Sequence, residues 1–444
     1  MPPRDGSMSQ STPLAVSRWW TQQRWWIGVL LLLVTAIGSI DRQVMSVNAK
    51  TIIGAFALSN TQYGELGFAF LLAYGIGQLI SGLLVDKFGT RQSLSFAVVL
   101  WSIAAIAHAV ASGFWSLFLA RAMLGLTEGP NLPAAFKAIA EWFPRAERSM
   151  ATGLITAGTG LGLILAPPLG GLLASAFGWQ AAFIVPGVAG LIWVWFWQRS
   201  YFLPEQHPRV SAQERELALR ERVVAPNQAA TWKQRVALWS YYLRYRETWG
   251  LVLARFVGDG AFYFFAFWLP LYLQRERGFS ILSVAFVAVL PFLCADLGSL
   301  SGGWIGQRLI QSGWSVDRSR RTMIWIGSVG SLVAWPVASV SQWWVALLLA
   351  SLSIMSIQLK SASLFPLAAD MYPARDVATV WGLSGAAGSI GGALFQFAVG
   401  SLVDHFGYNA AFVTASLMCV VQAMLISAMI PKIEPLTPLH EVAA

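Results

Sequence analysis

Apolar segments long enough to cross a bilayer recur twelve times along the chain, and this repetition constrains the fold more than any other feature. A helix needs roughly 20 mostly apolar residues to cross the hydrocarbon core of a membrane. Only 11% of the residues are charged, against about 25% in soluble proteins. The sequence therefore predicts an all-α polytopic membrane protein. The twelve spans are expected at 26–47, 62–84, 93–112, 115–138, 149–175, 180–199, 250–272, 281–304, 322–340, 343–367, 378–402 and 408–430.

The spans fall into two related halves of six. When the sequence is shifted by 229 residues, residues 141–183 align on residues 370–412 without a gap, and 13 of the 43 positions are identical. Pseudo-symmetric halves are typical of transporters, which bind their substrate near mid-membrane between the two repeats. The expected domains are a leader (1–25), an N-terminal half (26–199), a central loop (200–249), a C-terminal half (250–430) and a tail (431–444).

Basic residues alternate between the two sides of the predicted membrane. We number the loops between spans from the N-terminus. The leader and the even-numbered loops hold most of the basic residues, whereas the odd-numbered loops hold only Lys50, Arg275 and Arg277. By the positive-inside rule, both termini are expected in the cytoplasm. The expected location is the plasma (inner) membrane. The net charge of +9 then reflects topology, so no nucleic-acid partner is expected. In the central loop, Ser211 and Glu214 form a capping-box pattern that predicts a short helix, expected to serve as a surface tether.

Charged residues lie inside two of the predicted spans. Asp41 and Arg42 are adjacent in span one, and Glu128 shares a face of span four with Arg121. Each such charge costs roughly 2.5–3.5 kcal/mol at mid-membrane, so it is expected to face a wet cavity or another charge. Two interpretations stay open for each. Asp41 and Arg42 either orient their helix as an ion pair or handle a proton and an anion, and Glu128 either pairs with Arg121 or Lys137 or carries a proton.

Several short motifs, taken together, resemble the major facilitator superfamily. Within it they resemble the anion:cation symporter branch, and specifically the bacterial hexuronate-type transporters. The motifs are Asp41-Arg42, residues 72–78, 82–91, 131–137 with 141–144, 255–259 with 267–270, and 295–298. The resemblance implies twelve helices in two halves, and inward transport of a sugar acid or another small organic anion together with protons. It implies that the proton gradient drives transport without a cofactor. Asp41 and Glu128 would carry protons, and Arg42 would bind the substrate carboxylate.

Further candidate residues complete the expected site. Tyr74, Gln78, Asn131 and Gln358 are candidates for hydrogen bonds to substrate hydroxyls, and Trp268 for stacking on a sugar ring. Lys360 aligns with Asn131 in the repeat and could attract an anion, or else pair with Asp370 or Asp296. Arg121, Arg255 and Asp259 are assigned to a charge network, in which Arg255 and Asp259 are spaced to pair with each other. Gly82, Asp86, Gly89 and Arg91 are assigned to a gating motif that would latch one side of the protein closed, and Gly89 is expected to form a tight turn within it.

One departure from the resemblance concerns the pocket. Relatives commonly have an Asn-Tyr pair shortly before the aspartate and arginine, where this chain has Gly38, Ser39 and Ile40. Loss of a large polar aromatic side chain is expected to widen or reshape the pocket.

An exporter, a sensor and an enzyme are the alternatives to the importer. Residues 158–162 and 166–168 in span five are loosely similar to antiporter motifs, which keeps a proton-coupled exporter as the alternative. A transporter-like sensor is less favoured. An enzyme is not expected, because the sequence has no nucleophile–base set, metal-ligand set or phosphate-binding loop. The expected partners are an organic anion, protons and the lipid bilayer, and we expect a monomer.

Overall fold

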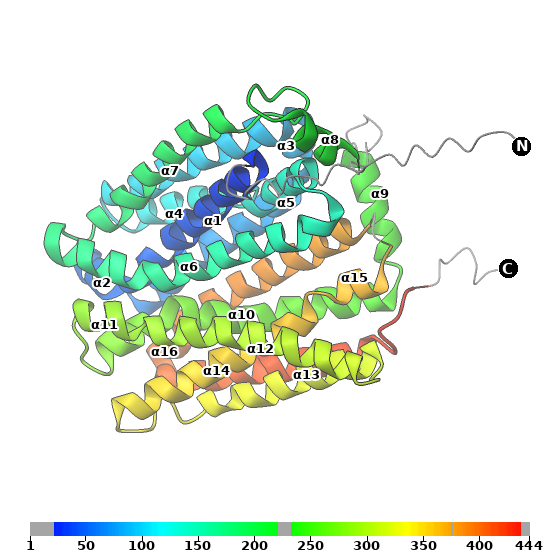
Figure 1. The fold of residues 1–444 in the computed structure, drawn as a ribbon. Helices are drawn as coiled ribbons and strands as arrows, with labels where there is room; N and C mark the ends of the chain where they lie inside the picture. Colours follow the sequence, from blue (N-terminus) through cyan, green and yellow to red (C-terminus); the bar gives the residue numbers. More distant parts are fainter. Residues whose placement is uncertain (1–21, 221–231, 374–375, 437–444) are drawn as a thin grey trace, which may run out of the picture.

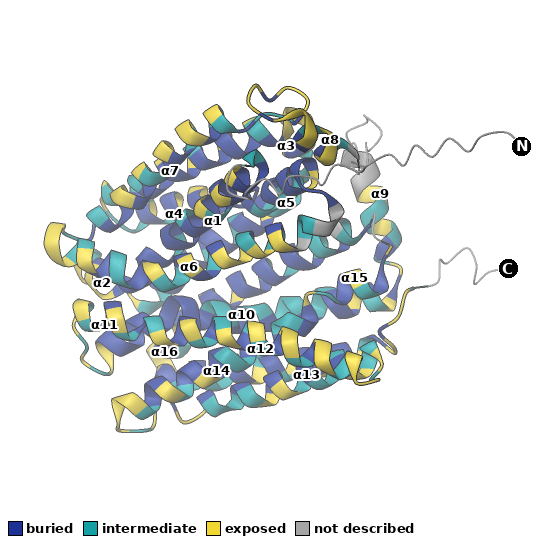
Figure 2. Ribbon diagram, viewed as in Figure 1, coloured by how far each residue is buried: buried dark blue, intermediate teal, exposed yellow. Residues whose placement is uncertain are grey.

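The computed structural model describes residues 22–220, 232–373 and 376–436, and the regular elements in these ranges are all helices. Figure 1 shows two bundles lying side by side, the early part of the chain (blue to teal) in one and the later part (green to red) in the other. Large apolar side chains such as Phe96, Leu119 and Leu300 are exposed. In Figure 2 exposed residues lie on the outer faces of the bundles, and buried residues lie inside them. Such extensive apolar exposure fits a surface that faces lipid.

The helices follow one another in two groups separated by the central loop. The first group is α1 (Gln23–Val47), α2 (Ala49–Phe56), α3 (Asn60–Ala109), α4 (Phe114–Glu128), α5 (Asn131–Trp142), α6 (Arg145–Phe177) and α7 (Ala181–Ser200). The loop contains α8 (Ala212–Arg220) and α9 (Trp232–Tyr242). The second group is α10 (Arg246–Arg275), α11 (Ile281–Val287), α12 (Val289–Gln311), α13 (Val316–Gly330), the 3-10 helix η2 (Ser331–Ala334), α14 (Trp343–Leu364), α15 (Leu367–Met371) and α16 (Val377–Met429).

Nine helical segments of the described residues are long and apolar enough to cross a membrane. One of them, Thr379–Met429, has 51 residues and contains two predicted spans joined at Gly407. Predicted span four is divided between α4 and α5, and span nine between α13 and η2, so neither reaches the length and hydropathy of a crossing in one helix. The twelve-span, two-half fold is confirmed, and the differences lie only in how the helices are divided.

The tight turn predicted at Gly89 is present within α3. Gly89 has φ 75° and ψ 163°, and Gly407 has φ 73° and ψ 177° at the equivalent place in α16. Only glycine adopts this region of backbone space without strain. These two residues therefore turn the chain back between consecutive spans.

The two halves make polar contact at the end of the molecule opposite the termini. Gln43 in α1 donates to the Ala266 carbonyl of α10 at 2.6 Å, and Tyr63 in α3 donates to the Phe267 carbonyl at 2.9 Å. Pro270, four residues after Ala266, has no N–H, so the Ala266 carbonyl has no helical partner and can accept from the other half. Gln274 donates to Val47 at 2.8 Å, and Asn60 donates to Asp404 at 2.7 Å.

The opposite end of the interface is open. A cavity of about 660 Å³ lies between α3, α5, α9 and α16. Residues that line it include Gln78, Gly82, Leu132, Lys137, Trp239 and Trp381. Figure 1 places α9 at the end of the bundles where both termini emerge. In the described residues, the halves are therefore bonded to each other at one end and have a cavity between them at the end that carries the termini.

The first part of the central loop is docked onto the N-terminal half, and its expected role as a surface tether stays a prediction. The predicted helix is present as α8, and Ser211 caps it by accepting from the Glu214 N–H at 3.1 Å. The Glu214 carboxylate is buried and accepts from the backbone N–H of Arg24 at 2.9 Å and of Gln23 at 3.2 Å. It thereby supplies the cap that α1 lacks at its own N-terminus.

We predict that Gly89→Ala lowers the stability of the protein by about 1–3 kcal/mol, because alanine is strained at this backbone position. A Cβ at Gly89 would meet no atom within 4 Å, so strain and not collision is tested. Gly113→Ala is the matched control, since Gly113 is extended (φ 169°) and its Cβ site is equally open. The measurement is the thermal melting temperature in detergent. Equal melting of the two variants would contradict the prediction.

Candidate functional site

An ion pair joins α1 to α4 inside the N-terminal half. Arg42 Nη2 lies 3.0 Å from Glu128 Oε2, and Arg42 Nε lies 3.4 Å from the same oxygen. The Glu128 side chain is 1% exposed and that of Arg42 is 22% exposed. Glu128 therefore forms its ion pair with Arg42 and not with Arg121 or Lys137 of span four. Lys137 instead donates to the Val85 carbonyl at 3.2 Å.

Asp41 lies beside this pair but is not bonded to it. Its side chain is buried, and within the described residues neither carboxylate oxygen has a hydrogen-bond partner. Asp41 and Glu128 are close enough to interact electrostatically. A buried charge without a donor costs several kcal/mol, and a proton on Asp41 would remove that cost. The structure thus brings together two carboxylates and one arginine.

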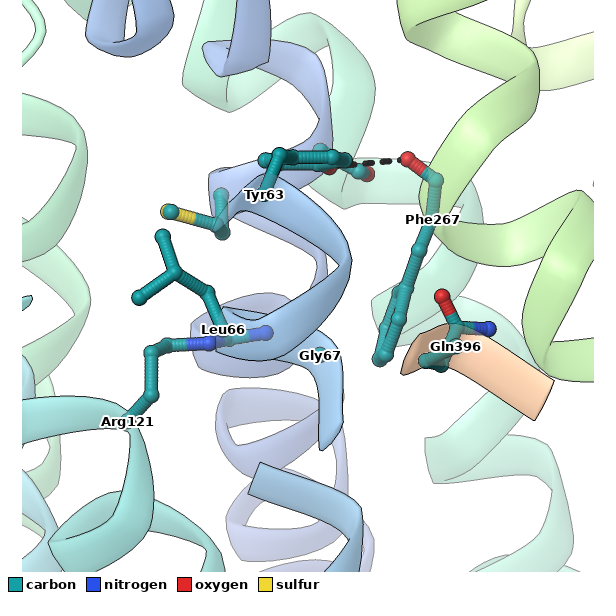
Figure 3. A pocket seen from close by; sticks show the side chains of 8 residues that line it. Tyr63, Leu66, Gly67, Arg121, Phe267 and Gln396 are labelled. Carbon is teal, nitrogen blue, oxygen red and sulfur yellow. Dashed lines mark hydrogen bonds between the residues drawn. The ribbon is translucent and has the colours of Figure 1, made fainter. Parts of the chain in front are cut away.

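Arg121 is buried on α4, two turns before Glu128. Its guanidinium lies over the Phe70 ring at 4.8 Å, and its Nε and Nη1 have no hydrogen-bond partner within the described residues. Figure 3 shows its side chain reaching toward Leu66 and Gly67 in a small pocket that also contains Tyr63 and Phe267. The void there is about 10 Å³, close to the room that one water molecule needs. Its predicted part in a charge network stays a prediction.

A second ion pair lies in the C-terminal half. Arg255 and Asp259, one turn apart on α10, pair at 2.9 Å, as their spacing predicts. The Arg255 guanidinium lies 5.1 Å from the ring centroid of Phe365 and 5.2 Å from that of Trp381. Its Nη1 atom is buried and has no hydrogen-bond partner within the described residues.

Three of the predicted hydroxyl-binding residues lie around these charges. The Tyr74 ring packs 4.9 Å from the Arg42 guanidinium. Gln78 lines the cavity, and its Oε1 is unpartnered within the described residues. Asn131 is buried with an unpartnered Oδ1, and its amide nitrogen would lie 3.6 Å from a Cβ placed on Gly38. Gly38 therefore leaves room beside Asn131, whereas Ser39 packs against Gly162 of α6.

Two other candidates are held by hydrogen bonds within the C-terminal half. Trp268 is fully buried and donates to Gln396 Oε1 at 2.7 Å, so no face of its ring is open for the predicted stacking on a sugar. Lys360 is buried and donates to Gln422, so it points neither at the cavity nor at the predicted partners Asp370 and Asp296. Gln358 is partly exposed on α14.

The predicted gating motif makes its described contacts within the N-terminal half. Arg91 donates to the Gln198 carbonyl, and its guanidinium lies 4.1 Å from the Phe202 ring. Gly82 lines the cavity. The side chain of Asp86 lies outside the described part of the chain, so its predicted latch stays a prediction.

Tyr263 also belongs to this site, although no sequence motif singles it out. It interacts electrostatically with Arg42 and Tyr74 of one half and with Asp259 and Arg255 of the other. Arg255, Asp259 and Tyr263 recur every four residues on α10 and so share one face. This four-residue spacing is visible in the sequence and indicates that Tyr263 lies on the same helix face as the charged pair.

Two six-span halves with charged side chains buried beside a cavity between them define a polytopic membrane transporter. The chain belongs to the Major Facilitator Superfamily, whose sequence profile matches residues 31–311 and 309–442.

Curated relatives cover nearly the whole chain. It is 30% identical over 405 residues to the hexuronate transporter of Escherichia coli (strain K12), which covers 91% of this chain and 93% of the relative. It is 30% identical over 407 residues to a Bacillus subtilis (strain 168) protein named "Probable galactarate/D-glucarate transporter GudP", with 88% and 89% covered. The fold is similar to that of a bacterial homologue of the human lysosomal transporter Spinster, with a TM-score of 0.71, 18% identity, and 92% and 95% of the chains covered.

We predict that Arg42→Met destabilises the protein by about 3–5 kcal/mol, because Glu128 is left as a buried charge without its partner. Adding Glu128→Gln in the same chain should recover much of the loss. Arg320→Gln is the control, since it breaks a pair of similar length (2.9 Å) whose acid, Asp370, is 23% exposed, so water can solvate the carboxylate that is left and the loss should be smaller. Thermal melting at pH 8 checks this. If Glu128→Gln adds its own loss to that of Arg42→Met, the two residues are not coupled.

Proposed function

We propose that this protein imports a small organic anion of the sugar-acid type together with protons, by alternating access. The observation that supports this most directly is the Arg42–Glu128 pair, in which a buried acid is bonded to an arginine that is partly exposed. An anion entering between the halves meets Arg42 already bonded to a carboxylate, so substrate and Glu128 compete for one cation.

This competition offers a physical basis for coupling. A proton that neutralises Glu128 releases Arg42 to bind the substrate carboxylate, and loss of the proton favours release of the substrate. Asp41, buried and unpartnered within the described residues, is the second proposed proton carrier. The proton gradient then drives accumulation, with no cofactor required.

Alternating access is supported by the unequal ends of the interface. The basic loops favour a cytoplasmic position for the end with the termini, by the positive-inside rule. The structure would then be the state that exchanges substrate with the cytoplasm. Loading from outside requires the contacts of Gln43, Tyr63 and Asn60 with the C-terminal half to break.

The relatives support a sugar acid as substrate, since those described above are named for a hexuronate and for galactarate and glucarate. The room beside Gly38 and Asn131 supports a pocket of different shape. The antiporter-like glycines give no support to the exporter alternative, because Gly158 and Gly162 pack against α1 at Leu32 and Ala36. We propose a monomer in the bacterial inner membrane.

Uptake into proteoliposomes tests the proposal. We predict that Glu128→Gln abolishes accumulation driven by a proton gradient but preserves counterflow exchange, because exchange needs no net proton movement. Arg42→Ala should abolish both, since the anion loses its cation. Glu216→Gln, which removes an exposed acid on α8, is the control and should match the wild type. Unchanged anion affinity in Arg42→Ala, or accumulation by Glu128→Gln, would refute the assigned roles.

The pH dependence of transport tests Asp41 separately. Asp41→Asn fixes a neutral side chain, so the rate of uptake should vary less with pH than in the wild type. The measurement is the initial rate of uptake between pH 5 and 8 at constant membrane potential. A profile identical to that of the wild type would place the titrating group elsewhere.

A further inference from the structure

One seam between the two halves is formed by α6 and the α11–α12 segment, which lie side by side where the bundles meet (Figure 1). A Cβ placed on Gly171 would lie 2.5 Å from the Ala285 Cβ, and a Cβ placed on Gly160 would lie 2.5 Å from Asp296 Oδ2. These contacts are 11 residues apart on both sides of the seam, which is three helical turns. Asp296 is the middle residue of the 31-residue segment Ile281–Gln311 that crosses the membrane. The halves are therefore packed closely as far as mid-membrane.

The seam opens beyond Asp296. Gly153 and Gly303 are next in the same register, seven positions or about two turns closer to the end with the termini on each helix. Both are exposed, and a Cβ placed on either would meet no described atom within 4 Å. Glycine allows helix backbones to approach closely. The register therefore predicts that these two glycines meet when the halves close at that end, as the proposed alternating access requires.

The second seam, between α3 and α16, opens at an equivalent point that carries no charge. A Cβ placed on Gly75 would lie 3.2 Å from the Ser389 Cβ. Seven positions beyond these residues, Gly82 and Gly382 both line the cavity. Ser389 is the repeat equivalent, 229 positions later, of the glycine that faces Asp296. Where the first seam has the Asp296 carboxylate, the second thus has a glycine.

Asp296 has no cation to compensate a negative charge. Within the described residues its carboxylate is half-buried, takes part in no hydrogen bond or ion pair, and has no charged side chain near enough to interact electrostatically. The α11 helix carries no titratable group, and Lys360 of α14 donates to Gln422. Apart from the Cys294 thiol, the remaining titratable groups of α6, α12 and α13 lie in the two turns nearest the end with the termini: Arg145, Glu147, Arg148, Arg308, Asp317, Arg318, Arg320 and Arg321.

We propose that Asp296 is a positioning residue for transport, which allows α6 and α12 to close around it when it carries a proton and keeps the seam open when it is charged. Contact between Gly153 and Gly303 would enclose the carboxylate between two helices in the middle of the membrane. An enclosed charge without a partner is strongly disfavoured, whereas a protonated carboxyl is not. Asp296 acts through helix packing, unlike Asp41 and Glu128. This inference rests on the alternating access of the proposed function.

Double electron–electron resonance between two spin labels tests this proposal. The labels are attached through Met150→Cys on α6 and Gln307→Cys on α12, both exposed, in the full chain with Cys294→Ser and Cys419→Ser. We expect the fraction of short distances in lipid nanodiscs to be at least about threefold larger at pH 5.5 than at pH 8. Asp296→Asn, which is isosteric and always neutral, should give the larger fraction at both pH values. A role in packing alone would leave the pH response unchanged.

Two further variants control the measurement. Gly303→Leu places a large side chain where the register predicts contact between glycines, so the labels should stay apart at both pH values. Glu216→Gln removes an exposed acid on α8, outside the seam, and should respond to pH as the wild type does.

The outcomes separate this inference from the proposed function. A wild-type distance distribution that does not change with pH overturns the role of Asp296 and leaves proton-coupled transport intact. So does an Asp296→Asn protein that responds to pH as the wild type does, and closure in Gly303→Leu overturns the register. Short distances absent from every protein at both pH values overturn both the inference and alternating access. Because the wild-type response needs no substitution of Asp296, a variant that fails to fold cannot protect the inference.

Discussion

The Arg42–Glu128 ion pair is the interaction on which the arrangement of the site depends. A carboxylate that is 1% exposed cannot keep its charge without a partner, so the pair fixes α1 against α4. On its other side α1 packs against α6, where Gly158 and Gly162 allow the backbones to approach closely. The pair therefore stabilises the half only while Glu128 is charged. Any event that neutralises Glu128 or occupies Arg42 acts directly on the packing of α1.

The two halves use their charges differently despite their common repeat. Arg42–Glu128 joins two helices, whereas Arg255–Asp259 lies on α10 alone. Breaking the first pair changes how two helices are held, and breaking the second changes only one helix face. At the ends with the termini the symmetry persists: Glu147 binds Arg24 at 2.7 Å, and Asp376, 229 positions later, accepts from Tyr242 at 2.6 Å. An acid at the same position of the repeat therefore binds a neighbouring element in each half, whereas the ion pair that joins two membrane helices at the site lies in the N-terminal half.

The sequence predicts the spans, the turn at Gly89 and the Arg255–Asp259 pair, because each depends on residues close in the chain. It could not choose the partner of Glu128, since Arg42 is 86 positions away and two cations lie nearer in the sequence. The repeat fixes the depth of Lys360 but not its direction, because one residue along a helix rotates the side chain by about 100°. Trp268 shows the same limit: the bond to Gln396 that buries it joins helices 128 positions apart.

At the closed end of the interface, a hydrogen bond that is missing within α10 is replaced by a hydrogen bond from the other half. Pro270 cannot donate to the Ala266 carbonyl, so a helix that is otherwise self-sufficient keeps one strong acceptor free. Gln43 of the other half satisfies it at 2.6 Å, and Tyr63 satisfies the next carbonyl, Phe267. Each such bond contributes only about 1 kcal/mol net, because water can replace it. Several hydrogen bonds of modest strength therefore hold the closed end. A change in free energy of about the size of one ion pair can outweigh their sum.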